Sequence, residues 1–192
     1  MSLPSREEAL ELLHEYTQNE GLRKHAYAVE AAMRAYARKF GEDEDYWGLV
    51  GLLHDFDYER YPTEADHPFR GAEILERLGY PEDFRRAVLS HASHTGVPRE
   101  RLVEKTLFAV DELCGFITAV ALVRPSKAVA EVTPKSVKKK LKDKAFARSV
   151  SREDIQQGME ELGVDFNDHV AFVTAAMTEI AGRLDLAGDP QP

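Results

Sequence analysis

The chain has 192 residues, of which 43% are hydrophobic and 31% are charged, and its formal net charge is −9. This apolar fraction excludes a disordered protein, and the length predicts one domain over residues 1–192. The single cysteine, Cys114, excludes an internal disulfide. The acidic balance argues against a protein that binds long nucleic acids through its overall field.

The sequence also indicates where the protein is found. No apolar run approaches the ~18 residues that a membrane span requires, and the N-terminal residues MSLPSREEALEL lack the apolar region of a signal peptide. We therefore expect a cytoplasmic protein without a membrane partner. The sequence does not indicate its oligomeric state.

Helix signals recur along the first two thirds of the chain. Ser5 and Glu8 form a capping box before an apolar run, and Leu22–Phe40 carries apolar residues at three- and four-residue steps. Asp43 or Asp45 is predicted to start the next helix. Further helices are predicted over about 68–78, before Gly79, over 81–92 and over 99–123.

The last third of the chain carries the same kind of signals. Thr133-Pro134 opens a lysine-rich helix, Ser151 with Asp154 opens another that ends at Gly163, and Asn167 or Asp168 starts the last one. No segment alternates as a β-strand would. We therefore predict an all-α bundle with a core over about 20–125 and C-terminal helices over 126–187 packed on it.

A basic segment interrupts the acidic chain between residues 124 and 148. It holds nine Lys and Arg against two acidic residues, a net charge of +7. A solvated helix face is the more common role of such a run, and an anion-binding strip is the alternative.

Histidines and carboxylates recur at inward or helix-end positions. His25 lies on the apolar stripe of the 22–40 helix, His54-Asp55 ends an apolar helix, and Asp111 interrupts another. One inward histidine is usually a hydrogen-bonded core residue, and a lone buried carboxylate is often an ion-pair partner. Several together indicate a metal site, because imidazole and carboxylate bind divalent metals between facing helices.

The order His25 … His54-Asp55 … Asp111 resembles the H…HD…D signature of the HD-domain superfamily of metal-dependent phosphohydrolases. The surrounding blocks LRKHAYAVEAAM, GLLHDFDYE, HPFRGAEIL, SHASHTGVPRE and LFAVDELCGFI are similar to its bacterial HDIG-type branch. The similarity extends into KSVKKKLKDKAFARSV and SREDIQQGMEELGV, and therefore covers most of the chain. It implies an all-α HD-type helical bundle.

The resemblance also implies a set of metal ligands. His25, His54, Asp55 and Asp111 would hold one divalent ion, and His67 and His91 stand where some members carry ligands for a second ion bridged by the HD aspartate. His94 is an alternative to His91. The ligand set does not distinguish Mn, Fe, Co, Ni, Zn and Mg, or one ion from two. His14 and His169 match no motif position and are predicted to be surface or cap residues.

One departure from the family pattern concerns the group that would help to activate water. Some HD nucleotidases carry a glutamate three residues after the HD aspartate, where this chain has Tyr58. Asp57 is then the nearer catalytic candidate, beside Asp55 itself.

The resemblance predicts an enzyme that hydrolyses a small phosphorylated metabolite, most readily a nucleotide. Charge and local pattern alone, not the resemblance, predict that Arg124 and Lys127, which flank the Pro125 break, bind its phosphate. An HD-domain oxygenase with a mixed-valence di-iron centre is an alternative, because it uses nearly the same ligand set. A non-catalytic, nucleotide-binding HD module is another, although no core ligand is missing.

Overall fold

The computed structural model describes residues 3–188, and in this range the chain is all-α. Nine α-helices and two short 3-10 helices are present, without a β-strand among the described residues. The predicted fold class is therefore confirmed. The helices are α1 (Arg6–Tyr16), α2 (Glu20–Phe40), α3 (Glu44–Leu53), α4 (Phe69–Arg77), α5 (Glu82–Ser90), α6 (Leu102–Leu122), α7 (Pro134–Leu141), α8 (Arg152–Leu162) and α9 (Phe166–Glu179), with 3-10 helices η1 (Ser93–Thr95) and η2 (Val129–Glu131).

Side-chain caps begin four of the nine α-helices described above where the sequence predicts them. Ser5 forms the predicted capping box, and Thr133 and Ser151 accept hydrogen bonds from backbone N–H groups in the first turns of α7 and α8. Asp43, rather than Asp45, caps α3. The last helix begins earlier than predicted, because Asp165 caps it and the helix starts at Phe166.

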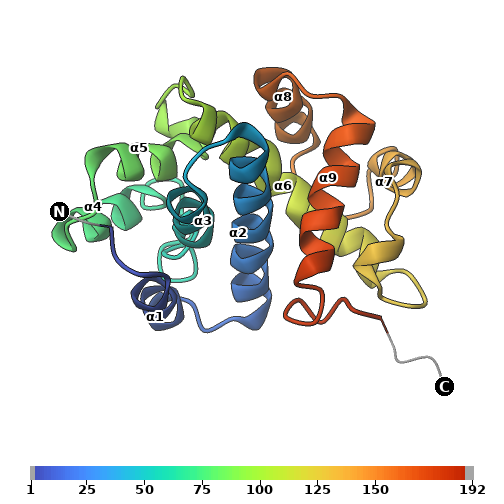
Figure 1. Ribbon diagram of the computed structural model, residues 1–192, viewed down its shortest axis with the longest axis horizontal. Helices are drawn as coiled ribbons and strands as arrows, with labels where there is room; N and C mark the ends of the chain where they lie inside the picture. Colours follow the sequence, from blue (N-terminus) through green and yellow to red (C-terminus); the bar gives the residue numbers. More distant parts are fainter. Residues whose placement is uncertain (1–2, 189–192) are drawn as a thin grey trace.

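Helix α2 lies at the centre of the bundle, between α3 and α9 (Figure 1). It approaches α3 closely at Gly51, where a Cβ atom would lie 2.9 Å from Met33 Cγ and 3.0 Å from the Val29 carbonyl oxygen. A larger residue at position 51 would push the helices apart. This close contact holds the end of α3 beside α2, and both helices also pack on α6.

The C-terminal helices cover the other side of α6. At Gly158 of α8, a Cβ atom would lie 2.7 Å from Ala109 Cα, so α8 is pressed onto the middle of α6. The chain then returns past η2, where the Val129 N–H donates to the Leu186 carbonyl over 2.8 Å. One continuous set of buried apolar side chains extends from Ala9 to Leu186.

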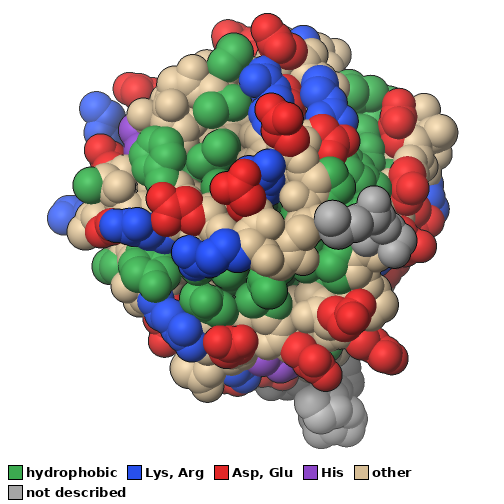
Figure 2. Space-filling view, turned by 90° about the vertical axis from the view of Figure 1, so that its left-hand side faces the viewer, with side chains coloured by type: hydrophobic (Ala, Val, Ile, Leu, Met, Phe, Trp, Pro, Cys, Tyr) green, Lys and Arg blue, Asp and Glu red, His purple; other side chains and the backbone are tan. Residues whose placement is uncertain are grey.

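The surface at the left of Figure 1 is mixed in charge. Figure 2 shows acidic and basic side chains interspersed over this side, with apolar side chains between them. A nucleic-acid-binding face would instead gather basic residues. Within residues 3–188, no helix has both the length and the apolar character to cross a membrane.

Candidate metal centre

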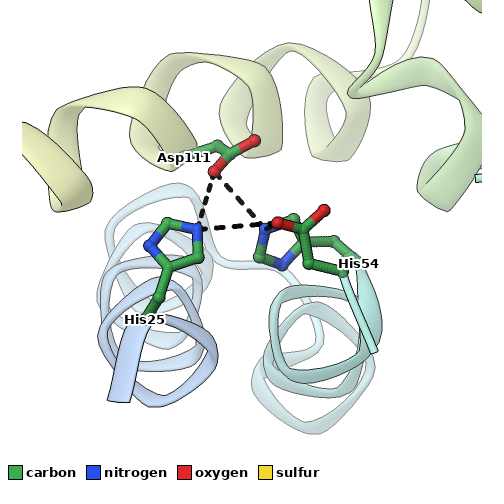
Figure 3. Close-up of side chains that lie close together, drawn as sticks. His25, His54 and Asp111 are labelled. Atoms are coloured by element: carbon green, nitrogen blue, oxygen red, sulfur yellow. Dashed lines mark hydrogen bonds and ion pairs between the residues drawn. The ribbon is translucent and has the colours of Figure 1, made fainter. Parts of the chain in front are cut away.

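Three helices bring His25, His54 and Asp111 together inside the bundle (Figure 3). His25 lies in the second turn of α2, His54 ends α3, and Asp111 lies in the middle of α6. The Asp111 Oδ1 atom is 2.9 Å from His25 Nε2 and 3.4 Å from His54 Nε2. With Asp55, these residues offer ligand atoms that all lie within 4.8 Å of one another.

A second cluster adjoins the first and consists of Asp55, His67 and His91. His67 lies in the loop before α4, and His91 ends α5. Their Nε2 atoms are 3.2 Å and 3.1 Å from Asp55 Oδ1. The two imidazoles therefore converge on one carboxylate oxygen.

Asp55 belongs to both clusters through different oxygens. Its Oδ1 faces His67 and His91, whereas its Oδ2 lies 3.5 Å from His54 Nε2 and 4.0 Å from His25 Nε2. A carboxylate that offers one oxygen to each of two ligand groups is suited to bridge two ions.

The hydrogen bonds of His54 and His91 indicate that this site fits a metal. His54 is fully buried and its Nδ1–H donates to the Gly51 carbonyl over 2.7 Å, but its Nε2 has no hydrogen-bond partner. His91 is held in the same way by the Val88 carbonyl, 2.5 Å from its Nδ1. Backbone acceptors on the far nitrogen are typical of metal-ligating histidines, because they fix the tautomer that leaves Nε2 free.

Asp57 orients His67 from behind. It is fully buried, its Oδ1 lies 2.9 Å from His67 Nδ1, and its Oδ2 accepts the Gly71 N–H over 2.8 Å. Gly71 permits this contact, because a Cβ atom there would lie 2.8 Å from Asp57 Cγ. The sequence suggested a catalytic role for Asp57, but its position behind His67 is that of a residue that orients a ligand.

The clustered carboxylates change the pKa values of the histidines beside them. Burial lowers the pKa of His54, but the charges of Asp55 and Asp111 outweigh this effect and raise it to about 10. Burial also lowers the pKa of His67, but its hydrogen bonds to Asp55 and Asp57 outweigh this effect and raise the pKa to about 9. Without a metal, the protonated imidazoles of His54 and His67 balance the charge of the carboxylates beside them. A metal ion must therefore displace these protons in order to bind.

The comparison with protein families agrees with this geometry. Residues 22–114 match the family model of the HD domain, and all six side chains of the two clusters lie within the match. This part of the chain is therefore similar to the HD domain. Comparison of the chain with curated proteins and with solved structures gives no match. The HDIG-type branch stays a prediction.

A cavity of about 500 Å³ opens onto the two clusters. Its lining includes His25, Asp55, His67, His91 and Asp111. The other charged side chains that line it are acidic and come from three elements: Glu64, Glu112 and Asp154. Among the described residues, no Lys or Arg contributes to this lining. Burial, the largest cause, raises the pKa of Glu112 to about 7.

Three other histidines lie outside the two clusters. His94 lines the cavity from η1, but its Nε2 donates to the His67 carbonyl over 2.8 Å. His91 and His94 do not share a helix face, since α5 ends at Ser90 and His94 lies in the separate 3-10 helix η1. His14 is partly exposed beside the Tyr27 hydroxyl, whereas His169 is buried and bonds Tyr36 and the Ala109 carbonyl. The prediction of a surface or cap residue is therefore wrong for His169.

The structure does not bring the predicted phosphate-binding residues to the cavity. Arg124 forms an ion pair with Glu131 at 3.0 Å, and Lys127 is exposed in the following turn. Both come after the end of α6 at Leu122, which lies about 16 Å along the helix from Asp111. Neither residue lines the cavity, so their predicted role in phosphate binding is not supported.

Proposed function

We propose that this HD domain is a metal-dependent phosphohydrolase that acts on a small phosphorylated metabolite. The observation that carries the proposal is the position of Asp55 between two groups of imidazoles, with one oxygen toward each. The HD family consists mostly of metal-dependent phosphohydrolases. His25, His54, Asp55 and Asp111 would hold one divalent ion, and Asp55, His67 and His91 a second.

The residues around the clusters have separate roles in this proposal. When bound, divalent ions supply activation of water at neutral pH and neutralisation of phosphate charge. The carbonyls of Gly51 and Val88 keep His54 and His91 in the tautomer that leaves Nε2 free. Asp57 positions His67 and does not contact substrate.

Glu112 is our candidate for the group that holds a proton during the reaction. It lines the cavity, lies outside both clusters, and accepts the Ser151 N–H through its Oε2 over 2.9 Å. A carboxyl group in the wall of the cavity can act as a general acid or base.

The negative charge of the cavity limits the number of phosphate groups that the substrate can carry. Because acidic side chains and no Lys or Arg line it, the negative charge of a phosphate would have to be balanced by the bound ions. Additional phosphates would lie against Glu64 or Asp154. We therefore favour substrates with a single phosphate, and among nucleotides the nucleoside monophosphates over the triphosphates.

The test is metal analysis of the purified protein, followed by phosphate release from matched mono- and triphosphates. We expect bound transition metal, and faster release from AMP than from ATP at equal concentration. Absence of bound metal, or absence of release from any phosphate ester in the metal-loaded protein, would overturn the proposal.

A di-iron oxygenase is a second candidate, because the same six side chains, four imidazoles and two carboxylates, suit iron. Visible absorption and oxygen uptake by anaerobically purified, iron-loaded protein separate the two functions. Oxygen uptake without phosphate release would favour the oxygenase.

A further inference from the structure

A second cavity of about 350 Å³ adjoins the first, and His25 and Gly115 line both. We call this second cavity the annex. Its remaining lining residues come from the start of α2, the end of α6 and the C-terminal segment: Gly21, Lys24, Thr118, Leu122, Leu184, Asp185 and Leu186. Each cavity has the volume of a small-molecule site.

The annex is apolar where the first cavity is acidic. Leu122, Leu184 and Leu186 contribute its aliphatic surface, and its two formal charges neutralise each other, because Lys24 Nζ lies 2.5 Å from Asp185 Oδ2. Leu184 and Leu186 are almost fully buried, so they form the inner wall. The annex therefore suits an uncharged group.

The walls of the annex are held in place by contacts outside it. The Leu186 carbonyl accepts the Val129 N–H over 2.8 Å, and Ala187 pairs with Ala128 in an isolated β-bridge. The Lys24–Asp185 ion pair joins α2 to the C-terminal segment. The cavity is thus formed without a ligand, which lowers the cost of binding one.

Gly115 lines both cavities and has no side chain that would separate them. It lies one helical turn after Asp111 on α6, so both residues are on the same face. A Cβ atom at position 115 would have only Val150 Cγ2, at 3.9 Å, within 4 Å. The space above Gly115 is therefore empty, and a branched side chain would occupy it.

We propose that the annex binds the apolar part of the substrate whose phosphate lies at the metal centre. This inference rests on the proposed function and narrows the substrate class to phosphate monoesters of apolar alcohols, with an aliphatic chain or a hydrocarbon ring. The match to the HD domain ends at residue 114. Most of the annex, from Gly115 to Leu186, lies beyond it, so this chain's own C-terminal part selects the substrate.

The test compares methyl, butyl and hexyl phosphate as substrates of the metal-loaded protein. We expect KM to fall about fourfold for each methylene that enters the annex. Leu122→Asp places a charge on its rim and should raise KM for hexyl phosphate about tenfold. Val123→Asp is the matched control: Leu122 and Val123 are 51% and 56% exposed, but only Leu122 lines the annex.

A binding measurement that needs neither metal nor turnover accompanies the kinetics. Addition of n-hexanol should shift the amide NMR signals of Gly115, Thr118, Leu184 and Leu186, and Gly115→Val should reduce these shifts. A KM that does not depend on chain length, or hexanol shifts confined to other residues, would overturn the annex assignment. Hexanol shifts at the annex without hydrolysis of any ester would instead overturn the hydrolase and leave the annex as an apolar ligand site.

Discussion

The two ligand clusters share Asp55, but the fold supports them differently. His25 and Asp111 project from within long helices, and His54 ends a helix that packs tightly on α2 at Gly51. His67 lies in a loop and His91 directly follows the last residue of α5, and Asp57 and the Val88 carbonyl orient their imidazoles. The first cluster depends on helix packing, whereas the second depends on individual hydrogen bonds. Single substitutions should therefore affect metal binding at one cluster and not at the other.

The largest effect is expected from Asp55→Ala, which removes the residue common to both clusters. We expect this variant to lose bound metal and all metal-dependent turnover, while its far-UV circular dichroism stays that of a helical protein. Glu73→Ala, which removes an exposed carboxylate from α4, is the control and should keep both the bound metal and the turnover. Normal metal content in Asp55→Ala would contradict the site.

A smaller effect is expected from Asp57→Asn, which acts on the second cluster alone. An amide cannot accept hydrogen bonds from both His67 and Gly71 through two oxygens, so one of these contacts is lost. We expect the affinity for the second ion to fall about 10- to 100-fold and the first to be unchanged. Metal titration followed by calorimetry checks this, and equal weakening of both ions would show that Asp57 has no selective role.

A pH effect is expected from His169, which belongs to neither cluster. Burial lowers the pKa of this imidazole, although its bond to the Ala109 carbonyl opposes the shift. Since the unfolded chain then binds a proton that the folded chain does not, the stability is present above pH ~6.5 and is lost as the pH falls toward the lower folded pKa. The free energy of unfolding should therefore fall more steeply between pH 7.5 and 5 in the wild type than in His169→Gln. Parallel pH profiles from denaturant titrations would contradict this.

The smallest effect is expected at the basic segment. Arg124→Ala breaks an exposed ion pair with Glu131, which contributes less than about 1 kcal/mol. We expect KM for a phosphate ester and its salt dependence to stay unchanged, because Arg124 does not line the cavity. An increase in KM that disappears at high salt would restore the phosphate-binding role.

Local signals in the sequence predict the helices well, because caps and apolar periodicity act within a few residues. Ser5, Thr133 and Ser151 cap the helices that they were predicted to cap. The start of α9 was predicted late, since Asp165, Asn167 and Asp168 are all suitable caps and only the backbone distinguishes them.

The candidate site depends on contacts that the sequence carries less directly. The resemblance pointed to the six residues that the fold brings together, but not to which oxygen of Asp55 faces which imidazole. The helix break after Ser90 separates His91 from His94, and this break has no strong sequence signal. Asp57 and Arg124 were given roles from proximity in sequence and from charge, whereas their three-dimensional partners, Gly71 and Glu131, indicate others.

The most direct test of the shared centre is the metal-to-protein ratio of His67→Ala beside that of the wild type, measured by elemental analysis after identical purification. The account predicts about two ions per chain in the wild type and about one in the variant, because His67 belongs to the second cluster alone. One ion in both proteins would contradict it, since His67 would then orient Asp55 without holding a metal.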